Sequence, residues 1–306
     1  MERLPQERRS LALSGGTLGH DGLHVGFCRL FTFLGVVECS RELSVRMQWL
    51  RFCRNGGEVE FGYRRDEHIV VCRGDMFGAY DATDEVVHAS NVELETPCVP
   101  GKMFALWNNF RAAAAQYSWD VPAEPLYFFK AANSFCRPRG EIRPPSSHRG
   151  RVIFEGELGV VIGRGGRDIA LDQADSHIFG YTCVNDVTAL DLLREDASFV
   201  QWSRAKSFDS FTPFGPCIDT DVDPATLLVR VQVNGRERQN YPVADMIFSP
   251  RELVSLLSRD VTLSPGDLIA CGTSLGASPL KPGATVEVII EGIGTLVNRY
   301  GECRNS

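Results

Sequence analysis

Two glutamates separated by one residue stand in an otherwise apolar stretch, FEGELGVVIG, at residues 154–163. The stretch is rich in β-branched residues and predicts a buried strand. Side chains two positions apart point to the same face of a strand, so Glu155 and Glu157 would place two carboxylates side by side. In a low-polarity setting such a pair resists ionisation unless a positive charge lies between the groups. We therefore expect a divalent cation here.

A third carboxylate, Asp186, ends the strand-like run GYTCVND. The end of a strand is a place where a side chain can project from a sheet edge into a cavity. Three carboxylates form a set of hard oxygen ligands that suits Mg²⁺, Mn²⁺ or Ca²⁺ better than zinc, which prefers nitrogen and sulfur. Taken alone, Asp186 could instead cap a helix in VTALDLL. Together with the two glutamates, metal ligation is the favoured interpretation.

A lysine and a glycine-containing turn supply further candidate groups. Lys206 lies in WSRAKSFDSFTPFGP, and beside a metal and an anionic substrate it could hold charge or shuttle a proton. An ordinary surface lysine is the alternative interpretation. The turn CGTSLG at residues 271–276 offers backbone N–H groups and two hydroxyls, which could cradle a carboxylate, although an ordinary tight turn would have the same composition.

The elements that must position these groups are mostly strands. Short alternating runs from Trp49 to about Glu95 predict a small β-rich domain: WLRF, EVEFGYR and HIVVCRG. The runs KMFAL and LYFFK predict two further strands, and between them NNFRAAAAQY predicts a helix with Asn108 or Asn109 as its N-cap. From Val152 onward the predicted strands are VIFEGELGVVIG, IFGYTCVND, LLVRVQVNG, DLIACGT and TVEVIIEGIG.

Helical patterns are fewer in this second part of the chain. Two are expected to begin at ALDQADSH and at ALDLLREDA. The clearest is SPRELVSLLSRD, with Ser249 as its N-cap and Pro250 at the first helical position. The sequence GRGGR at residues 163–167 lacks the G-x-G-x-x-G spacing of a dinucleotide site, so a dinucleotide oxidoreductase has no motif in its favour.

Composition restricts the class of protein. The chain has 306 residues, of which 43% are apolar and 23% charged, as in an ordinary globular protein. Its net charge of −7 argues against nucleic-acid binding. The ten cysteines are scattered and contain no C-x-x-C pair, which favours reduced thiols in a cytoplasmic protein over a disulfide framework. No apolar run approaches the roughly 20 residues of a membrane span, so no membrane association is expected.

Four segments are expected along the chain. Residues 1–46 read as a weakly structured extension, with a cryptic targeting peptide or a translation start at Met47 as alternatives. Residues 47–100 form the small β-rich N-terminal domain, residues 101–300 the catalytic domain, and residues 301–306 a tail.

Five sequence blocks, in order, resemble the fumarylacetoacetate hydrolase family: E-x-E-L-x-x-V-I-G, G-Y-T-x-x-N-D-V-T, K-S-F-D-x-F-x-P-F-G-P, L-x-P-G-D-x-I-x-x-G-T and E-G-I-G-x-L-x-N. The resemblance runs from about Lys102 to Tyr300. It implies a mostly β (α+β) fold, built on a rolled mixed β-sheet with a few packed helices and usually found as a homodimer. It also implies a Mg²⁺ or Mn²⁺ site with the metal ligands Glu155, Glu157 and Asp186 and the catalytic residues Lys206 and Thr273.

The resemblance implies substrates that are 2-oxo or 1,3-dioxo acids, whose carboxylate and keto oxygens can chelate a metal that stabilises an enolate. We expect cleavage of a C–C bond by hydrolysis or decarboxylation. One alternative is an isomerase or hydratase acting on an aromatic-ring-cleavage 2-oxo diacid of the 2-hydroxyhepta-2,4-diene-1,7-dioate type. Another is a non-catalytic binder of a small acid.

The chain departs from the family pattern at positions whose acid and base groups would decide between hydrolysis, decarboxylation and isomerisation. Ala113 falls near a histidine that activates water in hydrolytic members, and Asn108 and Leu190 stand where arginine is common. These losses resemble the decarboxylase and isomerase branch. His148 could supply a base or be a solvated loop residue, whereas His177 is expected to be structural.

The remaining expectations concern substrate binding. Candidate substrate-binding residues are Gly272, Ser274, Asn108 and Lys130. Trp107 and Phe110 could form an apolar lid over the site, with core packing as the alternative.

Overall fold

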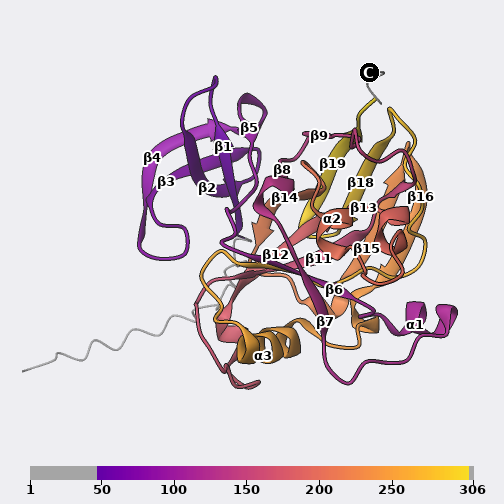
Figure 1. Ribbon diagram of the computed structural model, residues 1–306. Helices are drawn as coiled ribbons and strands as arrows, with labels where there is room; N and C mark the ends of the chain where they lie inside the picture. The colour runs from indigo at the N-terminus through magenta and orange to yellow at the C-terminus, as the bar shows by residue number, and fades with distance from the viewer. Residues whose placement is uncertain (1–46, 303–306) are drawn as a thin grey trace, which may run out of the picture. The chain divides into compact units, whose positions relative to one another are not determined.

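The computed structural model describes residues 47–302 (Figure 1). Within this range it contains nineteen strands and three α-helices. The predicted fold class, a mostly β chain with mixed sheets and few helices, is confirmed. The expected extension at residues 1–46 and the last four residues of the tail lie outside the described range. None of the helices in residues 47–302 is both long enough and apolar enough to cross a membrane.

The larger sheet has twelve strands. Two of them lie off its main path: β5 (Glu93–Leu94) pairs with β1, and β8 (Phe135–Cys136) pairs with β14. Most neighbours are antiparallel, but β6 and β17 are parallel, as are β8 and β14, so the sheet is mixed. The main path runs in the order β4 (Tyr80–His88), β3 (His68–Gly74), β2 (Val59–Arg65), β1 (Gln48–Cys53), β14 (Thr212–Asp219), β12 (Ile178–Asn185), β11 (Gly156–Ile162), β17 (Leu268–Ala270), β6 (Met103–Trp107) and β7 (Leu126–Lys130).

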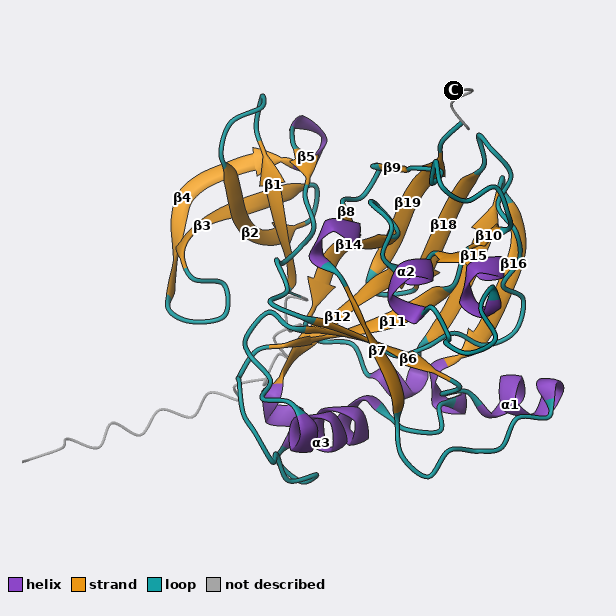
Figure 2. Cartoon of the chain, viewed as in Figure 1, coloured by secondary structure: helices purple, strands orange, loops and turns teal. Residues whose placement is uncertain are grey.

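A second sheet of five strands packs against the middle of the first, where its strands contact β11, β12 and β14 (Figure 2). Its order is β16 (Arg236–Pro242), β15 (Leu228–Val233), β18 (Thr285–Ile290), β19 (Gly294–Tyr300) and β9 (Glu141–Ile142). A short ribbon pairs β10 (Val152–Ile153) with β13 (Thr188–Ala189). Alternating apolar side chains of both sheets form the core between them, among them Leu158, Val160, Val229, Val231, Val286 and Val288.

Gly156 allows β11 and β15 to pack closely against each other. A Cβ at this position would lie 2.2 Å from Val231 Cγ2, which no side chain could accommodate without displacing β15. The glycine between Glu155 and Glu157 is therefore required by packing, and it fixes the first residues of β11 against β15.

The predicted helices are only partly correct. The clearest one is α3 (Pro250–Asp260), which starts where predicted. The helix expected over residues 108–117 begins only at Arg111, as α1 (Arg111–Tyr117), with Phe110 at its N-cap. Neither asparagine caps it, because Asn109 is committed elsewhere: its side-chain amide donates to Cys271 O at 2.8 Å and accepts from Phe248 N at 2.9 Å.

Two further predicted helices are wrong. The segments at residues 170–177 and 189–197 contain only 3₁₀ turns, at Ala174–His177 and Leu190–Arg194. The second turn buries only Leu192, so it lacks the continuous apolar stripe that stabilises an α-helix. The third α-helix, α2 (Trp202–Lys206), is a short helix that carries Lys206 at its last position.

Strand β14 was not predicted, because TPFGPC reads as a turn by its prolines. The structure accommodates Pro216 through a shift in register between β12 and β14, where Cys183 pairs with Gly215 but Tyr181 pairs with Asp219. On the side that faces β12, residues 216–218 therefore lie in an irregular stretch in which no regular ladder hydrogen bond is demanded of Pro216.

Replacing Ser249 by alanine should lower the free energy of unfolding by about 1 kcal/mol, since the residue caps α3. Its backbone N–H and its hydroxyl donate to Glu252 Oε2 at 2.8 Å and 2.6 Å. Urea unfolding measures the loss. Ser147→Ala, at an exposed loop position, is the matched control and should be neutral. An equal effect of the two substitutions would contradict the capping role.

Candidate metal centre

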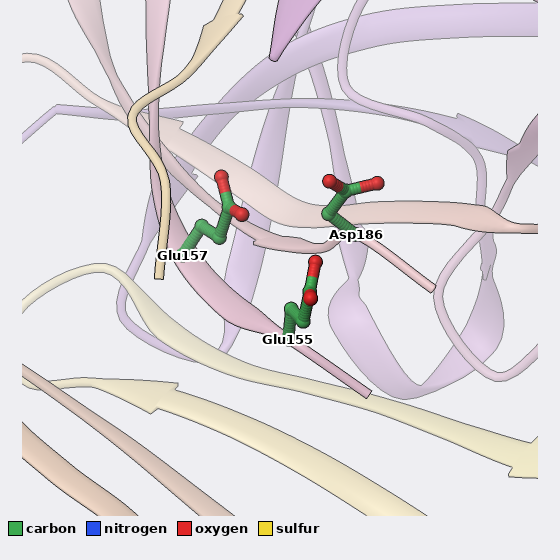
Figure 3. Close-up of side chains that lie close together, drawn as sticks. All are labelled: Glu155, Glu157 and Asp186. Atoms are coloured by element: carbon green, nitrogen blue, oxygen red, sulfur yellow. The ribbon is translucent and has the colours of Figure 1, made fainter. Parts of the chain in front are cut away.

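The three carboxylates singled out in the sequence lie together at the adjoining ends of two paired strands (Figure 3). Glu155 directly precedes β11, Glu157 is the second residue of β11, and Asp186 directly follows β12. Because β11 and β12 are antiparallel with Gly156 opposite Asn185, the end of one strand meets the beginning of the other. The Asp186 backbone N–H donates to Glu155 O at 2.8 Å and closes this corner. Asp186 caps no helix, so that alternative is wrong.

The geometry of the three carboxylates fits a hard divalent cation. One oxygen from each lies within 4.8 Å of the others. Mg²⁺ and Ca²⁺ hold oxygens at about 2.0–2.6 Å, so oxygens on opposite sides of one ion are about 4–5 Å apart. Glu157 and Asp186 are 1% and 0% exposed. Glu155 is half-buried, which leaves a side from which a small molecule could reach the ion.

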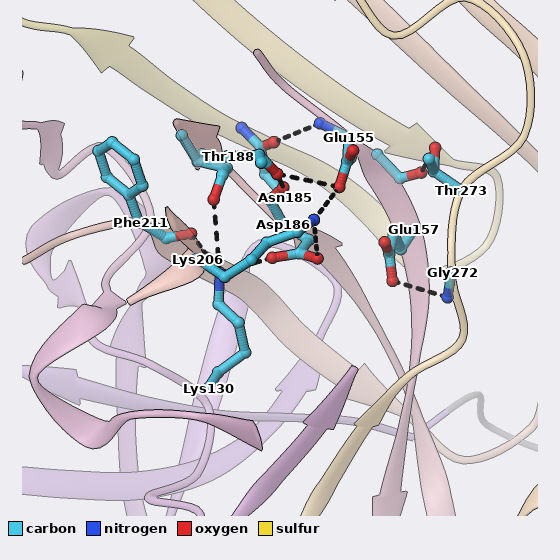
Figure 4. A network of polar contacts seen from close by, with 12 residues as sticks. Lys130, Glu155, Glu157, Asn185, Asp186, Thr188, Lys206, Phe211, Gly272 and Thr273 are labelled. Carbon is cyan, nitrogen blue, oxygen red and sulfur yellow. Dashed lines mark hydrogen bonds and ion pairs between the residues drawn. The ribbon is translucent and has the colours of Figure 1, made fainter. Parts of the chain in front are cut away.

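Two of the four lysines in the chain converge on Asp186 (Figure 4). Lys130, at the end of β7, donates to Asp186 Oδ1 at 2.5 Å and to Phe211 O at 3.1 Å. Its side chain is fully buried, and a third, longer contact reaches Val187 O at 3.5 Å. The sequence suggested Lys130 as a substrate-binding residue, but the structure directs its ammonium group to Asp186 and the backbone behind it.

Lys206 is placed differently, between two of the carboxylates. Its ammonium donates to Asp186 Oδ2 at 2.6 Å and also to Glu155 Oε2. Burial by itself would lower the pKa of Lys206, but the attraction of Asp186 and then Glu155 outweighs it and raises that pKa above its ordinary value. Lys206 is therefore a charged group beside the candidate cation site.

The acidity of the three carboxylates differs because their partners differ. Burial opposes ionisation of Asp186, yet the ammonium groups of Lys130 and Lys206 overcome it and lower its pKa. Burial raises the pKa of Glu155 although Lys206 works against this. Burial also raises the pKa of Glu157 well above its usual value, and the Asp186 carboxylate reinforces the shift.

Among the described residues, Glu157 is thus the carboxylate that forms no direct bond to a cationic side chain, and the attraction of Lys206 only partly opposes the rise in its pKa. Its Oε2 accepts a hydrogen bond from Gly272 N at 2.8 Å, and no described cationic side chain bonds to it. A buried carboxylate without a positive partner is costly. The position where a cation would restore the balance is therefore the space that Glu157 shares with Glu155 and Asp186.

A network from β16 fixes the segment between the two glutamates. Gln239 Oε1 accepts from Gly156 N at 3.0 Å, and its Nε2 donates to Thr273 Oγ1 at 2.9 Å. Thr273 Oγ1 in turn donates to Gly156 O at 3.0 Å, and the Tyr241 hydroxyl donates to the same carbonyl. The turn with Gly272 and Thr273 is thereby tied to the carboxylate-bearing strand.

Sequence reasoning missed Gln239 and Tyr241. Strand β16 is rich in Arg, Glu and Asn, which are poor strand formers. A sequence signal was nevertheless present, because an Asn-Gly pair such as Asn234–Gly235 favours a two-residue hairpin turn. Both residues have positive φ, as that turn requires, and the buried side chains of Gln239 and Tyr241 follow at alternate positions.

Of the remaining candidates, Ser274 belongs to the turn beside Glu157, whereas Asn108 and His148 form no hydrogen bond with the three carboxylates within the described residues. Ser274 is buried, and its carbonyl accepts from Gln239 at 3.4 Å. Asn108 donates to Asp120 O at 2.9 Å, while its buried Oδ1 has no partner in the described part of the chain. The His148 ring lies with Asp191 around Gly150, where a Cβ would be 2.4 Å from the ring and 2.5 Å from the carboxylate. Within residues 47–302, no hydrogen bond or ion pair joins His148 to Glu155, Glu157 or Asp186.

Trp107 and Phe110, which could form a lid over the site or pack in the core, differ in burial. Phe110 is fully buried and packs edge-on against Tyr241 at 4.9 Å, so it is a core residue. Trp107 is half-buried. His177 is buried, and its Nδ1 bonds to Arg164 O at 2.7 Å, as expected for a structural histidine.

Comparison with known proteins adds independent information. Residues 102–300 match the family described as "Fumarylacetoacetate (FAA) hydrolase C-terminal", and residues 47–97 match one described as "Rv2993c-like, N-terminal". The oxaloacetate tautomerase YisK of Bacillus subtilis is 35% identical over 226 residues, covering 69% of this chain and 74% of that protein.

Two solved structures are also similar. The 2-hydroxyhepta-2,4-diene-1,7-dioate isomerase from Mycobacterium marinum has a TM-score of 0.77 and 35% identity, covering 85% of this chain and 100% of that one. The fumarylpyruvate hydrolase from Pseudomonas aeruginosa, solved in complex with Mn²⁺ and pyruvate, has a TM-score of 0.63 and 30% identity, covering 72% and 93%.

Replacing Lys130 by methionine should destabilise the protein by about 3 kcal/mol, because it removes one partner of a buried ion pair and leaves Phe211 O without its donor. Urea unfolding at a fixed metal concentration measures this. Lys281→Met, at an exposed position, should be neutral. A loss below about 1 kcal/mol for Lys130→Met would show that Lys206 alone suffices to hold Asp186.

Proposed function

The chain belongs to the fumarylacetoacetate hydrolase family, and we propose that it is a divalent-metal-dependent enzyme that cleaves a carbon–carbon bond in a 2-oxo or 1,3-dioxo carboxylic acid. Proteins similar to it include a hydrolase, an isomerase and a tautomerase. These reactions share the need to stabilise an enolate. A substrate that presents a carboxylate and a neighbouring keto oxygen suits all of them.

One observation carries the proposal: Glu157 is buried close to Glu155 and Asp186, and no described cationic side chain bonds to it. This arrangement supports Mg²⁺ or Mn²⁺ as the resident cation, and the Pseudomonas relative holds Mn²⁺ together with pyruvate. When bound, such a cation supplies a Lewis acid for the substrate oxygens and lowers the pKa of a neighbouring water.

The side chains around the cation position have separable roles in this proposal. The metal ligands are Glu155, Glu157 and Asp186. Lys130 orients Asp186 by donating to its Oδ1. Lys206 faces the same space with a charged ammonium group, so it can bind the developing oxyanion or deliver a proton to the enolate. Gly272, Thr273 and Ser274 present their turn beside Glu157, where the substrate carboxylate would lie.

Isomerisation through the same enolate is the second candidate, and one observation favours it. Ala113 is 4% exposed and contributes no ionisable group to the site, so the chain offers no histidine there to activate water. Proton transfer by Lys206 alone would suffice for a tautomerase or isomerase.

The family matches at residues 47–97 and 102–300 support a division of the chain into an N-terminal β-rich domain over residues 47–100 and a catalytic domain over residues 101–300. The homodimer that the family resemblance implies stays a prediction.

Metal removal and Glu157→Gln test the proposed centre. Acetylpyruvate and oxaloacetate are incubated with protein that has been stripped by chelator and then reloaded with Mn²⁺ or Mg²⁺, and pyruvate release is followed with lactate dehydrogenase. We expect activity only after reloading. Glu157→Gln should lose at least ~100-fold in turnover together with Mn²⁺ binding, because it removes the uncompensated charge.

Glu58→Gln, at an exposed position, is the control for this substitution. Pyruvate release that survives both chelation and Glu157→Gln would contradict the proposed centre. Loss of enol absorbance without pyruvate release would instead select the isomerase.

Lys206→Met should separate turnover from metal binding. We expect turnover to fall by roughly 100-fold, the usual contribution of a positioned proton donor, while Mn²⁺ still binds, because the ligands are carboxylates. Titration calorimetry with Mn²⁺ provides the second measurement. If Mn²⁺ binding disappears together with turnover, Lys206 serves to build the centre rather than to act on substrate.

A further inference from the structure

A continuous series of aromatic rings leads from the protein surface to Lys206. We call the five residues the aromatic wall: Tyr117, Trp119, Trp107, Trp202 and Phe128. In this order, neighbouring ring centroids lie 4.8, 4.9, 6.1 and 5.0 Å apart. Three of the four tryptophans in the chain belong to it. So dense a cluster of flat apolar groups next to a polar centre needs an explanation.

The wall ends at the candidate metal centre. The Lys206 ammonium lies 5.3 Å from the centroid of the Phe128 ring, and the same ammonium bonds to Glu155 and Asp186. Trp202 and Lys206 are the first and last residues of α2. Phe128 and Lys130 are two positions apart on β7, so they face the same side of that strand. The same two elements thus carry both the wall and the groups around Asp186.

The rings of the wall are accessible, unlike those of the core. Tyr117 is 53% exposed and the other four are half-buried, whereas the nearby Phe110 is 0% exposed. Rings that only filled the core would be closed off by their neighbours. Apolar aromatic surface beside a few convergent polar groups is instead typical of a ligand-binding site.

We propose that the aromatic wall binds the tail of the substrate, and that the substrate is a 2-oxo or 1,3-dioxo monocarboxylic acid whose far end is apolar and preferably aryl. The inference rests on the proposed function, because the acid head must be held at Glu155, Glu157 and Asp186. With such a head in place, a tail directed along α2 and β7 meets the rings of Trp202 and Phe128.

The charges of the centre favour the same substrate class. Three carboxylates, two ammonium groups and a divalent cation leave a single positive charge when all are ionised. One substrate carboxylate neutralises it. Both ammonium groups lie at Asp186, beside the acid head, so neither is placed to bind a second carboxylate at the far end of a diacid.

Tryptophan fluorescence of the Mn²⁺-loaded protein provides the test, since three reporters lie in the wall. Trp49→Phe removes the fourth, which is buried in β1 against Phe61 and Tyr63, and serves as the reference protein. The probes are oxalate (a head without a tail), phenylpyruvate (an aryl tail) and 2-oxoglutarate (a carboxylate tail). We expect phenylpyruvate to quench the fluorescence and to bind at least ~10-fold tighter than 2-oxoglutarate, a difference of about 1.4 kcal/mol.

Two substitutions at Trp107 then locate the effect. Trp107→Leu keeps apolar bulk but removes the ring, so phenylpyruvate affinity should fall by roughly 10-fold while oxalate affinity stays unchanged. Trp107→Phe keeps a ring and should retain most of the preference, which controls for general damage to the fold.

The outcomes separate this inference from the proposed function. If oxalate fails to bind the Mn²⁺-loaded protein and chelation changes nothing, the metal centre itself is wrong. If oxalate binds but 2-oxoglutarate binds as tightly as phenylpyruvate, the centre stands and the wall proposal is overturned. Unchanged ligand affinities in Trp107→Leu together with an altered oligomeric state would also overturn it, and would assign the rings to a contact between proteins.

Discussion

The repulsion among three closely spaced carboxylates, two of them buried, is the constraint on which the rest of the site depends. Glu157 and Asp186 are almost completely buried and share a small space with Glu155. Such a cluster is tolerable only where positive charge is supplied, and the fold brings Lys130 and Lys206 to it from two different elements. No described cationic side chain bonds to Glu157, and that imbalance is what supports the proposal of a cation site here.

The same repulsion explains why several hydrogen bonds hold the backbone between the two glutamates. Repelling groups stay close only if their backbone cannot separate. Gly156 is pressed against Val231, and its N–H and carbonyl are held by Gln239, Thr273 and Tyr241. The two inward side chains of the polar strand β16, Gln239 and Tyr241, therefore hold the backbone segment from which both glutamates project. The rigid part of the centre lies on this side, while Lys206 and the aromatic wall lie on the other.

The sequence predicted those parts of the molecule whose signals are local. The spacing of Glu155 and Glu157 in an apolar run, the acidic end of β12, and the Ser-Pro start of α3 are each visible within ten residues. Lys130 acts on Asp186 across 56 positions, through a contact between β7 and a strand that is not its neighbour, so no local pattern could reveal its role. Strand β14 was hidden by its prolines, since the irregular pairing that admits Pro216 exists only in the assembled sheet.

The position of β7 at one end of the larger sheet has a consequence of its own. Among residues 47–302 this strand pairs only with β6, so its outer edge has no described strand beside it, and edge strands open more readily than central ones. Yet β7 carries the ammonium that neutralises Asp186, deep inside the fold. Opening of β7 would remove a counter-charge from Asp186. If the proposed cation binds at the three carboxylates, its binding and the opening of β7 would therefore be thermodynamically linked, and the cation would stabilise a strand that it does not contact.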